Sequence, residues 1–259
     1  MTTTPNGDAA LTLEQVVDAV NAGLAEGSAL FNITAKSILC CMRVPGFGRY
    51  SMDLARLALR HRSNGVVGVD LAGDESKIDA AHPDDPRHVA AFQFAFQNGV
   101  HRTAHAGEAG PASNVAAAME TLHAERIGHG YRVLDDDAIF EKLKMSGVHL
   151  EQCPYSSVKT GAFNVTQFGW RRHPIRRFFQ EGASFSINTD DPTVTGHTLV
   201  DDYGVVASTE AGVGLPLQAL VDSVRNAVDA AFVDGDEKQR LREEVERRLQ
   251  IALDLANRK

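Results

Sequence analysis

The stretch that decides the fold is VHRTAHAGEAGPASNVAAAMETLHAERIGHG, residues 100–130. It opens with VHRTAH, a short run typical of a β-strand, and closes with RIGHG, a second short strand. Between them, SNVAAAMETLHAE predicts a helix with Ser113 as its candidate N-cap. A strand, a helix and another strand in this order predict a parallel βαβ unit, because parallel strands need a crossover connection that is usually a helix.

The same alternation extends along the chain. Each expected strand is followed by a helical pattern, and only helices are expected from His197 onward. This order is typical of α/β proteins with parallel strands. We see no internal repeat, low-complexity tract or strong linker, so residues 1–259 are expected to form a single domain. The six expected strands are 37–43, 65–72, 99–105, 126–129, 147–152 and 183–190.

Residues able to carry chemistry gather just after these strands. In a parallel α/β barrel the carboxyl ends of the strands form the active-site face. Delivery of acids and histidines to one rim by several strands therefore favours a TIM-type barrel enzyme. An open doubly wound sheet follows the same rule and stays open as an alternative. The residues concerned are Gly73 with Asp74, His105 with Glu108, His129, Cys153 with Ser156, and Asp190 with Asp191.

Composition narrows the class of protein. The chain has 43% apolar and 23% charged residues, as ordinary globular proteins do, and its net charge of −8 disfavours a broad nucleic-acid-binding surface. No apolar run approaches the roughly 20 residues that span a bilayer. The start, MTTTPNGDAA, lacks the basic and apolar regions of a signal peptide, and the three cysteines form no spaced framework. We therefore expect a cytoplasmic protein that binds neither nucleic acid nor membranes.

Two residues are candidate metal ligands. His105 and Asp190 each end an expected strand, and a histidine with a carboxylate suits zinc. Taken alone, His105 also fits a hydrogen-bonded loop histidine, and Asp190 also fits a helix entry in Asp-Asp-Pro. Their place on one rim with Glu108 and His129 favours the metal site.

Glu108 and His129 are the candidates for proton chemistry. A carboxyl group in a partly apolar site has a raised pKa and can donate a proton near neutrality. A histidine beside the reacting water can orient it and stabilise developing charge. The structural alternatives are a first-turn helix glutamate for Glu108 and a core histidine for His129.

The remaining motifs carry weaker signals. Gly73 lets a ligand approach the backbone after a strand, although a plain turn explains it equally. Cys153 precedes Pro154, and we interpret it as a packing residue because no local feature activates its thiol. The sequence has no GxGxxG before a helix, no P-loop and no GxSxG elbow.

Five motifs together resemble the adenosine deaminases. They are LAGDE (71–75), HAGE (105–108), RIGHG (126–130), EQCPYSSVKTGAF (151–163) and SINTDDP (186–192). SILCCMR and GVHRTAHAGE are similar to the animal-type enzymes, and the likeness runs from about residue 10 to the C-terminus. The resemblance implies a zinc-dependent (β/α)8 barrel that hydrolyses adenosine and 2′-deoxyadenosine, releasing ammonia.

The resemblance also implies a role for each rim residue. His105 and Asp190 match zinc ligands, and Glu108 matches the acid that protonates the purine at N1. His129 matches the histidine that positions the attacking water. In the same way, Gly73 matches the backbone donor to N3, and Asp191 matches the partner of N7.

The chain departs from the family at its start. Family members open with an HxH pair on the first strand, which supplies two further zinc ligands, but here no histidine precedes His61 and no HxH occurs. Six strands are expected where the family has eight, so we expect an incomplete barrel without the N-terminal segment that carries the pair. The isolated chain is then expected to hold zinc weakly, to be poorly active and to aggregate, unless a completing N-terminal segment or second chain is supplied.

Two other functions stay open at this point. One is a catalytically inactive relative that binds nucleosides or acts as a partner protein. The other is a deaminase for a different purine, such as adenine or a nucleotide. The second is disfavoured because LAGDE and TGAF resemble the adenosine branch. We also see no basic cluster at the rim for a 5′-phosphate, since the arginines at 171, 172, 176 and 177 fall on a helix beyond it.

Overall fold

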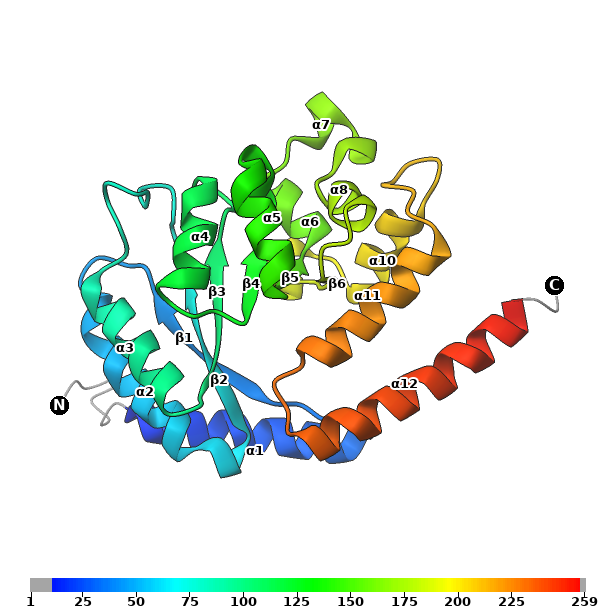
Figure 1. The fold of residues 1–259 in the computed structure, drawn as a ribbon. Coiled ribbons are helices and arrows are strands. Elements are labelled where there is room, and N and C mark those ends of the chain that lie inside the picture. The colour runs from blue at the N-terminus through cyan, green and yellow to red at the C-terminus, as the bar shows by residue number, and fades with distance from the viewer. Residues whose placement is uncertain (1–10, 257–259) are drawn as a thin grey trace.

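The computed structural model describes residues 11–256, so the expectation of no leader at 1–10 lies outside the described residues. Six parallel strands form one sheet, ordered along it as they are along the chain (Figure 1). The predicted parallel α/β architecture is therefore confirmed. The last strand is shorter than the predicted 183–190. The strands are β1 (Ser37–Met42), β2 (Val66–Ala72), β3 (His101–Ala106), β4 (Arg126–His129), β5 (His149–Gln152) and β6 (Phe185–Ile187).

Helices follow the strands and cover the outer face of the sheet. Helix α2 packs on β1 and β2, α3 on β3, and α11 on β6. Helix α4 begins at Ala112 after Pro111, and not at the predicted cap Ser113, because the proline's fixed φ places it directly before the first turn. The helices are α1 (Leu13–Phe31), α2 (Ser51–Arg60), α3 (Pro86–Gln97), α4 (Ala112–Glu120), α5 (Asp137–Ser146), α6 (Pro154–Lys159), α7 (Val165–Phe168), α8 (Ile175–Gln180), α9 (Pro192–Thr195), α10 (Leu199–Ala207), α11 (Leu217–Ala230) and α12 (Gly235–Ala256).

The two faces of the sheet differ in chemistry. Strand residues on the helix-covered face are fully buried and apolar, among them Leu71, Ala104 and Leu150. Their immediate neighbours Asp70 and Glu151 point to the opposite face, because successive strand side chains alternate. Asp70 and Glu151 therefore lie on the inner face, the side that encloses the interior when such a sheet closes into a barrel.

The sheet opens between β2 and β3 toward the rim. Their pairing extends only over Gly68–His101 and Val69–Arg102, whereas β3 and β4 stay paired up to the last residue of each strand. Arg43 bridges the opening, since its Nη1 donates to the carbonyls of Leu71 (3.3 Å) and His105 (2.8 Å). Its Nε donates to Asp84 at 2.7 Å, in an ion pair whose side chains are 4% and 11% exposed.

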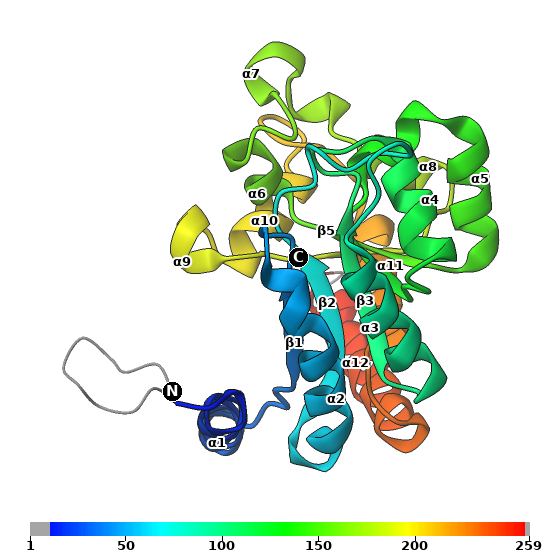
Figure 2. The ribbon, with the colours of Figure 1, turned by 90° about the vertical axis from the view of Figure 1, so that its left-hand side faces the viewer.

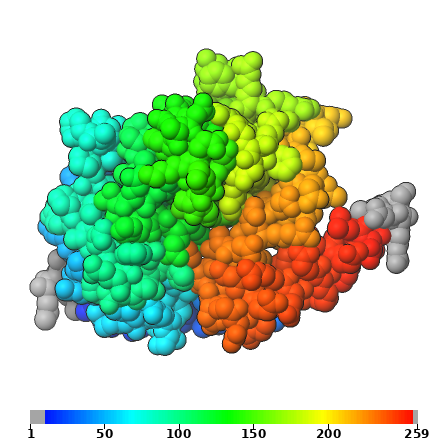
Figure 3. All heavy atoms as spheres, viewed as in Figure 1, coloured from blue at the N-terminus to red at the C-terminus, as the bar shows by residue number. Residues whose placement is uncertain are grey.

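Both edges of the sheet lack a second neighbour. Within residues 11–256, β1 pairs only with β2, and β6 pairs only with β5. Helix α1 lies below β1, and α12 projects from the body of the molecule (Figures 2 and 3). This open sheet agrees with the expected incomplete barrel. A search of the described helices finds none whose length and apolar character would let it cross a membrane.

Candidate active site

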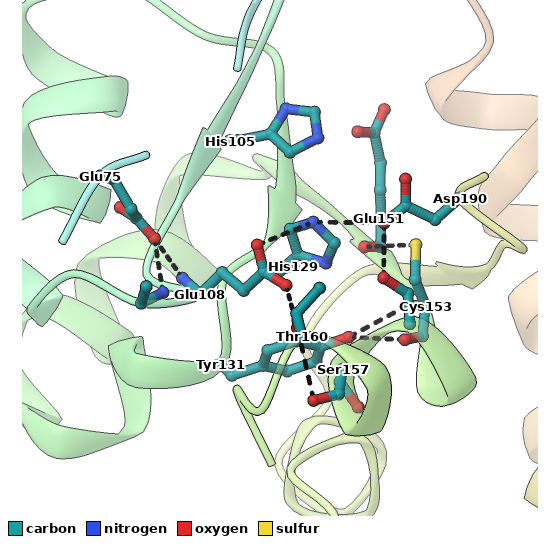
Figure 4. Close-up of polar contacts among 12 residues, drawn as sticks. Glu75, His105, Glu108, His129, Tyr131, Glu151, Cys153, Ser157, Thr160 and Asp190 are labelled. Atoms are coloured by element: carbon teal, nitrogen blue, oxygen red, sulfur yellow. Dashed lines mark hydrogen bonds and ion pairs between the residues drawn. The ribbon is translucent and has the colours of Figure 1, made fainter. Parts of the chain in front are cut away.

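Four of the predicted residues meet at the carboxyl ends of the strands. The rings of His105 and His129 lie with their centroids 5.1 Å apart. His129 Nε2 lies 3.5 Å from Glu108 Oε2 and 3.7 Å from Asp190 Oδ2 (Figure 4). The structure therefore places an imidazole between two carboxylates, with a second imidazole beside it.

The backbone holds two of these residues in a strained conformation. His129 has φ 66° and Asp190 has φ 64°, in the left-handed region that non-glycine residues rarely adopt. Side chains support both, because the Gln152 amide donates to the His129 carbonyl and Ser156 Oγ donates to Asp190 Oδ2 at 2.7 Å. Strain kept in place by such contacts is common at functional sites.

His129 is buried and favours its neutral form. Burial lowers the pKa of its imidazole, and this effect outweighs the attraction of Glu108, which raises it. Its Nδ1 is buried and has no hydrogen-bond partner among the described residues, while Nε2 faces the two carboxylates. A neutral imidazole can accept or donate one proton at Nε2, depending on its tautomer.

His105 is oriented by Asp70, an acid that sequence reasoning missed. Its Nδ1 lies 3.1 Å from Asp70 Oδ1. Burial lowers the pKa of His105, but the hydrogen bond and charge of Asp70, helped by Glu151 and Asp190, raise it to about 9. The available signal was an acid inside the otherwise apolar run VVGVDLA.

The residue before His129 is a glycine, Gly128, because a side chain there would meet His105. In the sheet register it stands directly beside His105, and a Cβ at this position would lie 3.1 Å from His105 Cγ. The missing side chain leaves room for the imidazole ring. Gly128 therefore packs against a neighbouring site residue.

Glu108 is held at its tip by a threonine. Thr160 Oγ1, just after α6, donates to Glu108 Oε1 at 2.7 Å. The glutamate side chain is 20% exposed, so it stays reachable from the rim. Thr160 belongs to the motif EQCPYSSVKTGAF, from which only Cys153 and Ser156 were considered individually.

Cys153 is buried, as a packing residue is, and its sulfur also lies near the candidate metal-ligand atoms of His129 and Asp190. His129, Cys153 and Asp190 each offer one ligand atom, and these atoms lie within 4.8 Å of one another. The thiol is buried, and burial raises its pKa well above the ordinary value. Tyr131 fixes this segment, because its hydroxyl donates to the Cys153 carbonyl at 3.1 Å and accepts from the Cys153 N–H at 3.2 Å.

The two other predicted residues lie on the rim but outside this cluster. Gly73 follows β2 with φ +110°, and a Cβ there would lie 3.2 Å from the Arg43 backbone nitrogen. Asp191 is exposed, and its carbonyl accepts from Val194 and Thr195 at the start of α9. Among the described residues, neither Gly73 nor Asp191 hydrogen-bonds to the two histidines.

The side chains fit zinc in donor type. A histidine whose Nδ1 is bonded to a carboxylate is typical of zinc sites, and His105 with Asp70 has this arrangement. Asp190 adds a carboxylate, which zinc accepts beside imidazole. The catalytic zinc sites of proteins usually have three protein ligands, so these two predicted ligands are fewer than usual.

Known proteins match most of this chain. The family described as adenosine deaminase matches residues 2–248. The adenosine deaminase of Danio rerio is 45% identical over 196 residues, which cover 76% of this chain and 52% of the relative. That of Mus musculus is 38% identical over 240 residues, covering 93% of this chain and 65% of the relative. The chain thus spans between half and two thirds of the length of these relatives.

Solved structures share the fold. A zinc-bound amidohydrolase from Burkholderia ambifaria superposes with a TM-score of 0.84 at 22% identity, covering 96% of this chain and 66% of the other. The adenine deaminase of Arthrobacter aurescens superposes with a TM-score of 0.78 at 24% identity, covering 93% and 69%. An Arabidopsis protein complexed with GMP gives a TM-score of 0.78 at 24% identity, with coverage of 95% and 69%.

Proposed function

Because the chain belongs to the adenosine deaminase family, we propose that its protein hydrolyses adenosine and 2′-deoxyadenosine, releasing ammonia. The observation that carries the proposal is the position of His129 Nε2 between Glu108 and Asp190. Replacing an amino group on a purine ring requires a proton for the ring and an oriented water. An acid, an imidazole and a carboxylate at one rim can supply both.

Zinc is part of the proposal. His105 and Asp190 would hold it, with Asp70 orienting His105 through Nδ1. When bound, zinc acidifies water and makes it a nucleophile at neutral pH. We also propose that a completing N-terminal segment, where one is supplied, would add the further ligands.

The chain's own residues would divide the work. Glu108, aligned by Thr160, would deliver a proton to purine N1, which draws electron density from C6. His129 Nε2 would hold the attacking water and pass its proton on as the amino group leaves as ammonia. Asp190 would keep His129 oriented, because it accepts the Ser156 hydroxyl and cannot turn away.

Two rim residues would position the purine. The Gly73 N–H would donate to N3, in a turn whose φ of +110° favours glycine. Asp191 would face N7.

We further propose that residues 1–259 form one incomplete barrel domain and that the protein is cytoplasmic.

The substrate is proposed to be a nucleoside, although Arabidopsis structural neighbours are complexed with the nucleotides GMP and IMP. Three of the four arginines beyond the rim are already engaged by the protein. Arg176 donates to the Val213 carbonyl at 2.6 Å, and Arg177 donates to Asp137 at 2.7 Å. Arg171 donates to the Thr209 carbonyl. These contacts argue against a 5′-phosphate site built from this group.

The experiment compares zinc-loaded protein on adenosine, 2′-deoxyadenosine, adenine and AMP, with ammonia release as the readout. The protein is assayed alone and joined to the N-terminal part of the Danio rerio relative that the chain does not match. We expect activity on the nucleosides from the joined protein and a fall of roughly 10²- to 10⁴-fold in Glu108→Gln. Nucleoside binding without zinc and without turnover would instead support an inactive binding relative, and a preference for AMP would support a nucleotide deaminase.

A further inference from the structure

We propose that Glu75 is a positioning residue of this site, whose buried carboxylate gathers the loop 107–109 and sets the direction of Glu108. The role rests on the proposed function in one respect, namely that Glu108 delivers the proton. Glu75 is the last residue of LAGDE, a motif from which only the glycine and the first acid were singled out.

The carboxylate of Glu75 accepts three consecutive backbone N–H groups. Gly107 donates to Oε2 at 3.0 Å, and Glu108 and Ala109 donate to Oε1 at 2.5 Å and 2.9 Å. Asn114 Nδ2 donates to Oε2 at 3.1 Å. Glu75 is 3% exposed, so these four donors replace the water that the carboxylate lost on folding.

The charge is retained in this position. Burial raises the pKa of Glu75, but hydrogen bonds from Asn114 and from the backbone of Gly110, Gly107 and Ala109 outweigh burial and hold the pKa below its ordinary value. Hydrogen bonds to an ionised acceptor are stronger than neutral ones. The loop is therefore attached by a cluster of strong contacts.

The glycines of the loop make the close approach possible. A Cβ at Gly110 would lie 2.8 Å from Glu75 Oε2 and 2.2 Å from Asn114 Nδ2. Gly107 has φ +70°, and a Cβ there would lie 2.6 Å from Val115 Cγ2. The pattern HAGEAG thus combines one functional glutamate with Gly110, which admits the buried acid that follows β2, and with Gly107, which packs against Val115.

The contact spans the opening between β2 and β3. Glu75 follows β2 and the loop follows β3, where strand pairing has already ended. Glu75 holds the backbone nitrogen of Glu108, while the carboxyl group of Glu108 contacts Thr160 and His129 (Figure 4). Without Glu75 the Gly107 carbonyl would still accept the Arg132 N–H at 2.7 Å, but the N–H groups of Gly107, Glu108 and Ala109 would lose their acceptor. The backbone from which the Glu108 side chain starts would then be held less firmly.

The first test measures the loop itself and needs no activity. Amide hydrogen exchange at 107–109 is compared in the wild type, in Glu75→Gln, and in the control Asp74→Asn. The control removes the same charge from the exposed neighbour. We expect these amides to exchange roughly 10- to 100-fold faster in Glu75→Gln, because a charged acceptor is lost, and to be unchanged in Asp74→Asn. Unchanged exchange in Glu75→Gln overturns the proposal.

A milder variant decides the matter if Glu75→Gln does not fold. Asn114→Ala removes one donor from the carboxylate, together with the contact of Asn114 to the Ile78 carbonyl, and leaves the three N–H groups of 107–109 on Glu75. We expect a smaller acceleration at the same three amides, with core amides of β3 unaffected. Equal acceleration throughout the chain would indicate a general loss of stability and would overturn a local role.

The second test uses turnover in the joined, zinc-loaded protein. We expect Glu75→Gln to lower kcat by about 10- to 100-fold with KM nearly unchanged, because misplacing a reacting group by about 1 Å costs this much. A change in KM alone would overturn the role in positioning Glu108. If the wild type shows no turnover, the proposed function fails, while the exchange test still decides whether Glu75 holds the loop.

Discussion

Gly130→Ala is the perturbation whose cost the structure defines most sharply. Gly130 follows His129, has φ +71°, and donates its N–H to the Ala106 carbonyl at 3.1 Å. A Cβ there would lie 2.6 Å from Leu150 Cδ2, inside the buried core. Gly147 is a matched control, because it has φ +72° and no atom within 4 Å of the added Cβ.

The two substitutions separate backbone strain from steric overlap. Each alanine in the left-handed region costs about 1–2 kcal/mol. Overpacking at Leu150 adds about 1–3 kcal/mol for Gly130→Ala only. We therefore expect a loss of about 1–2 kcal/mol in the free energy of unfolding for Gly147→Ala and about 2–5 kcal/mol for Gly130→Ala.

Urea unfolding of the metal-free proteins, followed by circular dichroism and by the fluorescence of the single tryptophan, measures both losses. Equal losses in the two variants would refute the reasoning, because they would show that the core around Leu150 accommodates the methyl group. A loss in Gly147→Ala that exceeds the loss in Gly130→Ala would refute the structure at β4.

Three further outcomes are expected. Asp70→Asn should weaken zinc binding by about 10- to 100-fold in calorimetric titrations, whereas Asp74→Asn should leave it unchanged, because only the former orients a ligand. Burial lowers the pKa of His149 and His173 to about 3. The unfolded chain then binds more protons than the folded chain below about pH 6.5. Stability should therefore fall as the pH drops from there toward 3, by up to about 1.4 kcal/mol per pH unit for each histidine. His173→Gln should flatten the dependence of the urea midpoint on pH, and an unchanged dependence would contradict this. The strand edges that have no second neighbour within residues 11–256 should make the purified chain associate as its concentration rises, which light scattering measures. Met42 is 46% exposed on the edge strand β1, and Met42→Lys should reduce the association. A wild type that stays monodisperse would contradict this prediction.

The order of the elements was predictable because it follows from local patterns. Each strand is a short apolar run, and each helix has apolar residues at helical spacing. The alternation of the two along the chain predicts a parallel sheet. Strand ends were less predictable. The run 183–190 was expected to be one strand, but only Phe185–Ile187 pairs with β5, because pairing depends on the neighbouring strand as well as on the run itself.

The residues of the site also fall into those that the sequence predicts and those that it does not. His105, Glu108, His129 and Asp190 were placed on one rim from sequence, since residues that follow parallel strands share an edge. Their partners were not found. Asp70, Glu75 and Thr160 act across 35, 33 and 52 positions of the chain, and no local pattern reports such contacts.

By itself, then, the sequence determined the parallel α/β class, the rim and the resemblance to a family, because these depend on periodicity and on motifs read in order. Only the tertiary structure decided which acid holds each functional side chain, where the sheet opens between β2 and β3, and which strand edges have no second neighbour within residues 11–256. The physical reason is that hydrogen bonds and strand pairing are satisfied in space, between groups brought together by folding, whatever their separation along the chain.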